Sequence, residues 1–269
     1  MISPAADAPA PRPALRPFPR PPGRALRFAG LLLAGLTGLA VGPARAIVGG
    51  EAAAPDIAAH VVLIVSTRGA SCTGSVVARD LVLTAAHCVH PAGDYAVALV
   101  SESQPRLVPA LRIVVHPAFN AEQFRTRRPT PDLALMKLAE PLPARFTPVR
   151  IATGGLPARG SFFLLAGFGV SAEGTEKTAG KLRTVLLASI GTTGGIMARL
   201  SPQSGLAGGC VGDSGGPAFQ NGEVAGVIGW ATGPNGARGC GGVTGVTLVG
   251  LHRDWILSTA RALGSPVGD

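Results

Sequence analysis

The sequence has few aromatic residues and no segment in which aromatic and basic side chains alternate. Aromatic residues make up 4% of its 269 residues, whereas 46% are hydrophobic, which is enough for a packed core. The formal net charge is +9, but six of the 24 basic residues precede Ile47, where Asp7 is the only acid. The one basic cluster beyond that point, Arg125 with Arg127 and Arg128, is interpreted as a solvated loop. We therefore expect no nucleic-acid partner.

The sequence also lacks any C-x-x-C pair among its four cysteines. This absence argues against a zinc knuckle or a dithiol redox centre. Cys72 lies near Cys88 in the sequence, and Cys210 lies near Cys240, although four cysteines allow more than one connectivity. Structural disulfides are the preferred interpretation. We expect no metal site and no cofactor.

No apolar stretch near the start of the chain reaches the length of a membrane-spanning helix. Arg16 to Arg27 form a positively charged region, and the apolar stretch from Phe28 to Val41 has 14 residues, whereas a spanning helix needs about 20. Ala44-Arg45-Ala46 then supplies the small-x-small pattern that signal peptidase cleaves. Residues 1–46 are therefore predicted to be a signal peptide, and the protein to be secreted, extracellular or periplasmic. An uncleaved leader that tethers the protein to a membrane is the alternative.

From Ile47 onward, short apolar runs recur between turn signals in a chain with 38 Gly and 24 Pro. The first series of predicted strands is 60–66, 74–77, 81–84, 95–100, 107–115 and 133–138, and the second is 162–165, 182–190, 217–219, 224–230 and 243–249. Strands of this length and spacing predict barrels or a sandwich. Proline-rich joints at 129–131 and 141–143 separate the two series and would join two β subdomains. Only Leu251 to Leu263 shows a helical pattern of apolar residues.

Three short segments carry the side chains needed to hydrolyse an amide with a serine hydroxyl. That chemistry requires a base for the hydroxyl proton, a carboxylate that orients the base, and donors for the tetrahedral oxyanion. The segments are Thr84-Ala85-Ala86-His87-Cys88, Asp132-Leu133-Ala134-Leu135 and Gly212-Asp213-Ser214-Gly215-Gly216-Pro217. Chain order and local context together make a chance arrangement improbable.

These segments resemble the TAAHC, DLAL and GDSGGP motifs of the chymotrypsin/trypsin-like serine proteases, in that family's order. The resemblance extends from Ile47-Val48-Gly49-Gly50 to the helix that contains Trp255. It implies an all-β fold of two six-stranded antiparallel β-barrels, packed face to face with the active site between them, plus a C-terminal helix. The protease domain would span residues 47–269, with its two barrels joined near residues 129–145.

The same resemblance implies a role for each residue of the three segments. Ser214 would be the nucleophile, His87 the general base and Asp132 the orienting carboxylate of a serine endopeptidase. The backbone N–H groups of Gly212 and Ser214 would form the oxyanion hole. A disulfide from Cys72 to Cys88 would fix the loop that carries His87. Protein or peptide substrates and protein inhibitors would be the partners of a monomeric enzyme.

The resemblance further implies an activation device at the start of the mature chain. In this family the ammonium group of a new N-terminus pairs with the aspartate before the nucleophile, which would here join Ile47 to Asp213. Ile47 directly follows Ala46, which leaves no room for a propeptide after the predicted signal-peptidase site. We therefore expect export and activation to be one event.

The predicted substrate pocket departs from the family pattern. Val224 to Ala231 resembles the strand that pairs with the substrate backbone and walls the pocket, with Gly229-Trp230-Ala231 where the family usually has Ser-Trp-Gly. Gly208 falls at the base of the pocket, where trypsin-like enzymes carry an aspartate, and Ala231 and Gly245 are expected to line its walls. The pocket should thus be neutral and favour medium apolar side chains. A non-catalytic homologue that acts as a binding module is the competing hypothesis, against which the complete triad argues.

Overall fold

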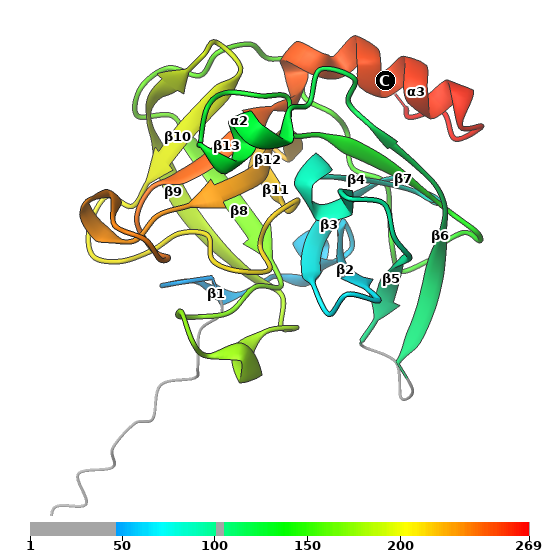
Figure 1. Cartoon of the computed structure of the whole chain (residues 1–269), viewed down its shortest axis with the longest axis horizontal. Helices are drawn as coiled ribbons and strands as arrows, with labels where there is room; N and C mark the ends of the chain where they lie inside the picture. Colours follow the sequence, from blue (N-terminus) through cyan, green and yellow to red (C-terminus); the bar gives the residue numbers. More distant parts are fainter. Residues whose placement is uncertain (1–46, 101–104, 269) are drawn as a thin grey trace, which may run out of the picture. The chain divides into compact units, whose positions relative to one another are not determined.

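The first barrel is a closed ring of six antiparallel strands in the order β2-β3-β4-β7-β6-β5 (Figure 1). The computed structural model describes residues 47–100 and 105–268. The strands are β2 (Val61–Ser66), β3 (Ser71–Ala78), β4 (Leu81–Thr84), β5 (Tyr95–Leu99), β6 (Arg106–Val115) and β7 (Ala134–Leu138). Because β2 pairs with both β3 and β5, the ring has no free edge that could pair with another chain.

The second barrel is also an antiparallel ring of six strands, in the order β9-β10-β13-β12-β11-β8, which the pairing of β8 with β9 closes. Its strands are β8 (Phe162–Gly167), β9 (Arg183–Thr193), β10 (Met197–Ser201), β11 (Pro217–Gln220), β12 (Glu223–Ala231) and β13 (Thr244–Leu248). The short strand β1 (Glu51–Ala52) adds to the outside of this ring by pairing with β9. The predicted fold of two six-stranded barrels is therefore confirmed.

Aliphatic side chains fill both barrels, as the scarcity of aromatic residues requires. In the first barrel, β4 is buried along its whole length and pairs on both sides. The interior of the second barrel contains one buried aromatic side chain, Phe163, among Leu, Val, Ile and Ala. Buried apolar runs of this kind lack strict alternation because side chains on both faces of the strand are covered.

Helices occupy little of the described chain. They are α1 (Pro55–Ala58), α2 (Ala121–Arg125) and α3 (Arg253–Ala262), together with the 3₁₀ turns η1 (Ala86–Val89), η2 (Glu176–Thr178), η3 (Pro234–Gly236) and η4 (Val249–His252). The predicted C-terminal helix is present as η4 followed by α3, which buries Ile256, Leu257 and Ala260 at helical spacing. No helix among the described residues has the length and apolar composition needed to cross a membrane.

The sequence failed to predict two strands, β1 and β10. In β10, Met197 and Ala198 are buried but the next residue, Arg199, is exposed, and the strand follows the tight turn at Gly194 and Gly195. Only its pairing with β9 and β13 gives it a place in the sheet. The pairing with β9 is a hairpin around Gly194 and Gly195, so the turn has a local signal, but Arg199 interrupts the short apolar run from which a strand would be predicted.

Candidate active site

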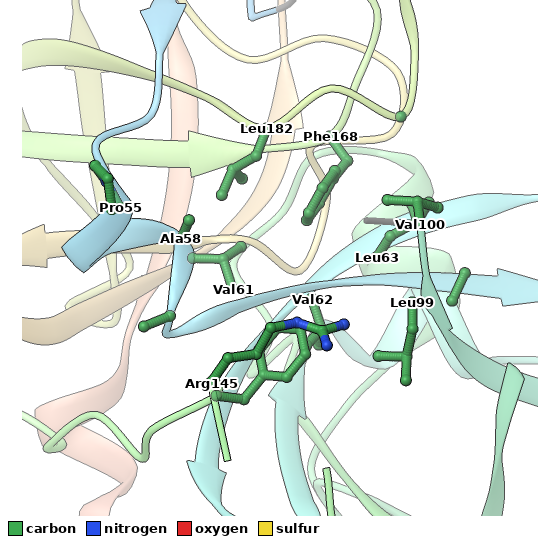
Figure 2. Close-up of a pocket in the computed structure, with 14 residues that line it drawn as sticks. Pro55, Ala58, Val61, Val62, Leu63, Leu99, Val100, Arg145, Phe168 and Leu182 are labelled. Atoms are coloured by element: carbon green, nitrogen blue, oxygen red, sulfur yellow. The ribbon is translucent and has the colours of Figure 1, made fainter. Parts of the chain in front are cut away.

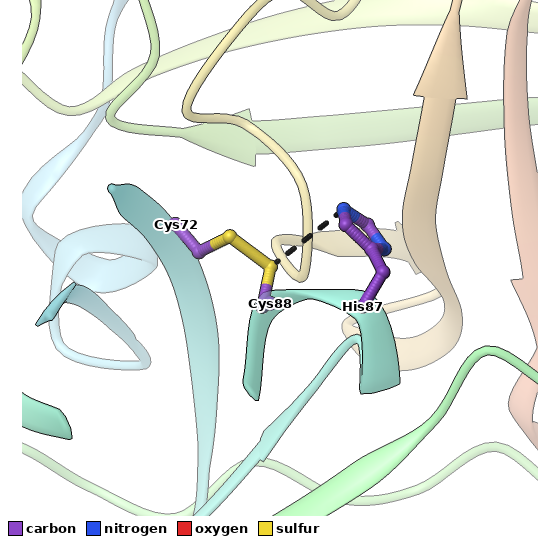
Figure 3. Close-up of side chains that lie close together, drawn as sticks. All are labelled: Cys72, His87 and Cys88. Atoms are coloured by element: carbon purple, nitrogen blue, oxygen red, sulfur yellow. Dashed lines mark hydrogen bonds between the residues drawn. A yellow bond between two sulfur atoms is a disulfide. The ribbon is translucent and has the colours of Figure 1, made fainter. Parts of the chain in front are cut away.

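His87 lies in η1, directly after β4, where a disulfide holds the turn in place. Cys88 is bonded to Cys72 on β3, and the Sγ atom of Cys88 lies 3.9 Å from Nε2 of His87 (Figure 3). Cys72, His87 and Cys88 bring ligand-capable atoms within 4.8 Å of one another. The two sulfur atoms are consumed in the disulfide, so they provide no thiolate for a metal ion. The cluster therefore positions the imidazole and does not form a metal site.

Asp132 orients this imidazole from the residue stretch that precedes β7. Its Oδ2 atom lies 2.7 Å from Nδ1 of His87, and its Oδ1 atom accepts the His87 backbone N–H at 2.9 Å. The side chain of Asp132 is 1% exposed, whereas that of His87 is 20% exposed. An ionised carboxylate accepts hydrogen bonds only, so the proton of the neutral imidazole belongs on Nδ1. Nε2 is then the atom that is available as a base.

Ser214 lies in a tight turn that packs directly against the first barrel. A Cβ atom on the neighbouring Gly215, where φ is +82°, would lie 2.1 Å from Thr84 Oγ1, so no larger residue fits there. The Ser214 carbonyl oxygen lies 3.5 Å from Cys88 Sγ, the same atom that contacts the ring of His87. Ser214 Oγ donates to the Gly229 carbonyl at 3.4 Å. The three residues of the predicted triad are thus gathered at the junction of the two barrels.

Thr73 on β3 ties the nucleophile turn to the first barrel, a role that the sequence did not reveal. Its backbone N–H donates to the Ser214 carbonyl at 2.8 Å, and its hydroxyl donates to the Gly212 carbonyl at 2.8 Å. The same hydroxyl accepts the Phe168 N–H at 3.1 Å. In the sequence, Thr73 lies just before the predicted strand 74–77, and only its position after Cys72 distinguishes it.

The turn at Gly212 contains the two residues of the predicted oxyanion hole, Gly212 and Ser214. Gly212 has a φ of +96°, and a Cβ atom there would lie 2.9 Å from the Cα atom of Gly169. Within the part of the chain that the structure describes, the N–H groups of Gly212 and Ser214 donate to no other backbone group. Two such donors on one turn are what a tetrahedral oxyanion requires.

Asp213 is completely buried beneath this turn, where glycines pack against its carboxylate. Oδ1 accepts the Gly169 N–H and Oδ2 accepts the Cys210 N–H, both at 2.8 Å. A Cβ atom on Gly167 would lie 2.2 Å from Oδ1, and one on Gly169 would lie 2.6 Å from it. Burial raises the pKa of Asp213 from 3.8 to about 7, against the lowering effect of the two backbone hydrogen bonds and of the charge on Arg183.

The segment that begins at Ile47 lies close to the nucleophile loop. Ile47 is fully buried in the core of the second barrel. The next residue, Val48, exchanges two backbone hydrogen bonds with Gly208, at 3.1 and 3.0 Å. Cys210, which donates to Asp213, is two residues beyond Gly208 and is bonded to Cys240. The predicted signal peptide, residues 1–46, lies outside the described residues.

The structure corrects one residue of the predicted pocket. Gly245 faces the indole of Trp230, because a Cβ atom on Gly245 would lie 2.2 Å from that ring. Thr244 instead lies beside Gly208, the predicted base of the pocket, since its Oγ1 atom would lie 2.9 Å from a Cβ atom on Gly208. The register of β12 against β13 shifts between Ile228 and Trp230, which places Ala231 opposite Thr244. A bulge of this kind cannot be read from the sequence.

Phe124 in α2 stacks on the ring of His87, another contact that the sequence did not predict. The two ring centroids are 4.1 Å apart and the planes differ by 15°. The Asn120 side chain caps this short helix by accepting the Gln123 N–H. The contact spans 37 positions of sequence between two loops, so no local pattern could have indicated it.

An apolar cavity of about 380 Å³ lies apart from these residues (Figure 2). Phe168 and Leu182 face it from the second barrel, and Val61 and Leu99 face it from the first, with Arg145 beside them. None of the predicted site residues is among the described residues that line it. This cavity is therefore not the substrate pocket.

Comparison with known proteins accounts for this arrangement. The family model described as Trypsin matches residues 47–256, which is most of the chain. The chain belongs to the trypsin family. It is a serine-type endopeptidase of that family, whose members act on protein substrates and are commonly inhibited by proteins.

Individual members of the trypsin family show how widely the likeness extends. Human Kallikrein-4 is 29% identical over 87% of this chain and 96% of its own length. Trypsin-3 of Salmo salar is 28% identical over 70% of this chain and 82% of its own length. Among solved structures, neuropsin from mouse brain has a TM-score of 0.66 at 23% identity, and covers 79% of this chain and 99% of its own. A mutant of human heparin binding protein has a TM-score of 0.64 at 22% identity, and covers 78% of this chain and 94% of its own.

Substitution of Gly229 tests how firmly the carboxylate of Asp132 is held in this trypsin-family chain. A Cβ atom on Gly229 would lie 3.4 Å from Asp132 Oδ2, which is ordinary contact, so a serine hydroxyl could reach the carboxylate. We expect the free energy of unfolding of Gly229→Ser to be about 1.5 kcal/mol higher than that of Gly229→Ala, because the serine hydroxyl gains a hydrogen bond to the charged carboxylate of Asp132. Both variants should keep measurable peptidase activity. Equal denaturation midpoints for the two variants would show that the added hydroxyl does not reach Asp132.

Proposed function

We propose that this endopeptidase cleaves peptide bonds through an acyl-enzyme formed on Ser214. His87 Nε2 takes the hydroxyl proton as Ser214 Oγ attacks the carbonyl carbon, and Asp132 stabilises the imidazolium that forms. The N–H groups of Gly212 and Ser214 receive the oxyanion. His87 then returns the proton to the leaving amine, and water hydrolyses the acyl-enzyme by the same route. The 2.7 Å contact from His87 Nδ1 to Asp132 Oδ2, beside the Ser214 turn, is the observation that carries this proposal.

A fluorophosphonate probe tests the assignment of Ser214 directly. The probe forms a covalent bond to an activated serine, so the mature enzyme should gain one adduct on the peptide that contains Ser214. Ser214→Ala is the matched control and should remain unlabelled. Labelling of the alanine variant would place the nucleophile elsewhere.

The proposed specificity is for apolar side chains of small to medium size before the scissile bond. Gly208 supplies no charge at the base of the pocket, so a buried Lys or Arg side chain would lose its hydration without gaining a partner. Thr244 is buried at the same place, and its Oγ1 atom accepts the Gly209 N–H at 2.9 Å. The threonine therefore shortens the pocket, which favours Val, Leu and Met over Phe.

We expect peptides with Leu, Met, Val or Phe before the scissile bond to have kcat/KM values at least about tenfold above those of matched Lys or Arg peptides. Thr244→Gly should raise kcat/KM for the Phe peptide relative to the Val peptide, because it lengthens the pocket. A series of fluorogenic peptides that differ only at that residue measures both effects. A preference for Arg would show that Gly208 is not the base of the pocket.

The proposed cellular form is a secreted monomer without a membrane anchor. Residues 1–46 would be removed as a signal peptide, to leave a protease domain of residues 47–269. Its two barrels join between the end of β7 at Leu138 and the start of β8 at Phe162, so only the second half of the predicted joint near residues 129–145 lies between them. Cleavage after Ala46 would produce the Ile47 terminus and would activate the enzyme in the same step. N-terminal sequencing of secreted protein tests this proposal, and a start at Ile47 is expected.

A further inference from the structure

A cavity of about 270 Å³ beside Trp230 is cationic. Arg127 contributes to it from the loop between α2 and Asp132, and Arg199 contributes from β10. The Arg127 guanidinium carbon lies 6.0 Å from the centre of the indole ring of Trp230, which forms an aromatic wall. Arg127 belongs to the first barrel, whereas Arg199 and Trp230 lie on strands β10 and β12 of the second barrel.

The charge of this cavity is not balanced by the residues that line it. Both arginines are exposed, and none of the described lining residues is Asp or Glu. The nearby Arg125 differs, since it pairs with Glu122 within α2. Arg127 also has a φ of +55°, a left-handed conformation that non-glycine residues rarely adopt and that the surrounding structure must enforce.

The cavity lies along the path expected for the substrate upstream of the scissile bond. Ser214 Oγ contacts the carbonyl of Gly229, and Trp230 and Ala231 continue the same strand away from the nucleophile. This is the strand that resembles the one with which the substrate backbone pairs. An extended chain advances about 3.3 Å per residue, so its third or fourth residue before the scissile bond would reach the Trp230 cavity.

We propose that this cavity is a subsite for an acidic side chain, Asp or Glu, at the third or fourth position before the scissile bond. A carboxylate there gains charge-assisted hydrogen bonds from guanidinium groups, while its methylene groups lie against the indole. The enzyme thus selects protein segments in which an acidic residue precedes a small or medium apolar one by two or three positions. This inference rests on the proposed role of Ser214.

The subsite is tested with peptides that carry Glu, Gln or Lys at the third or at the fourth position before the scissile bond, with one position varied at a time. For the wild-type enzyme, kcat/KM for the Glu peptide at one of these positions should exceed that for its Gln counterpart by roughly tenfold at low ionic strength. The Lys peptide should be cleaved more slowly than the Gln peptide. The Glu preference should shrink in 1 M NaCl, because salt screens exposed charges.

Substitutions of the two arginines identify the groups responsible. Arg127→Gln combined with Arg199→Gln should reduce the preference for Glu over Gln to less than about twofold. Arg125→Gln, at the end of the adjacent helix α2, is the matched control and should retain the preference. The proposal is overturned if the wild type does not distinguish Glu from Gln, or if the double variant still does. If Ser214 were not the nucleophile, the fluorophosphonate probe would leave it unlabelled, an outcome independent of the Glu preference.

Discussion

Replacing Ser214 or His87 by alanine should lower kcat by roughly 10⁶-fold in either case. Ser214→Ala removes the atom that attacks the carbonyl carbon, and His87→Ala removes the base that takes its proton. Both groups act in the same step, so each loss alone disables the covalent route. Steady-state hydrolysis of a Val or Leu peptide, with active-site titration of the wild type as reference, measures the effect.

The double variant should lose little more activity than either single variant. Once the nucleophile is gone, the base has no hydroxyl to deprotonate, so the second substitution removes nothing further. A residual rate about 10³- to 10⁴-fold above that in water should remain, since the oxyanion donors of Gly212 and Ser214 are backbone groups. Clearly additive losses would contradict the proposed unit of Ser214, His87 and Asp132.

A chain with even one extra residue before Ile47 should have a kcat/KM roughly 100- to 1,000-fold below that of a chain starting at Ile47. In the proposed switch, the Ile47 ammonium pairs with Asp213 and thereby orders the turn that carries the oxyanion donors. The expected loss of activity is as large as that caused by removing one hydrogen-bond donor from an oxyanion hole. Parallel refolding of the two chains, followed by peptidase assays, makes the comparison.

The two chains should also differ in how stability depends on pH. With residues retained before Ile47, burial raises the pKa of Asp213 to about 7, against 3.8 for the exposed group. Between these values the folded state binds more protons than the unfolded state, so the free energy of unfolding falls as pH rises from about 4 to about 7. Thermal denaturation of the extended chain over this interval should show that fall.

In the chain that starts at Ile47, the proposed switch would place the Ile47 ammonium group beside the carboxylate of Asp213. Pairing raises the pKa of this amino group above its free range of about 7.7 to 8.0. The stabilisation is therefore fully present below that range and is lost as pH rises through the raised value, so activity should decline in alkali. Asp213→Asn is the control, because it should depress activity at every pH. Full activity in the extended chain would show that the Ile47 terminus is not the switch.

Local sequence was sufficient to single out the residues to which the proposed chemistry is assigned. His87, Asp132 and Ser214 each stand in a short motif whose small neighbours are dictated by close packing, as the contact between Gly215 and Thr84 shows. Runs of apolar residues likewise predicted all six strands of the first barrel. The sequence could identify these features because each depends on neighbours within a few positions along the chain.

Features that depend on contacts between distant segments could not be predicted in this way. Thr73 reaches across 139 positions to Gly212, and Phe124 meets His87 through the fold of two loops. The choice of Thr244 over Gly245 as a pocket residue follows from a bulge that only the paired strands define. β10 was missed for a different reason, because Arg199 interrupts its short apolar run although its hairpin with β9 is local.

The glycines packed against Asp213 mark positions at which the protein should tolerate almost no substitution. Any side chain at Gly167 or Gly169 would collide with the carboxylate, so random mutagenesis should recover almost no active variants at these positions. The exposed loop that carries Arg127 and the turn at η3 meet no such obstacle. Directed evolution of new substrate preferences should therefore accumulate changes in these two loops, around a nucleophile turn that remains unchanged.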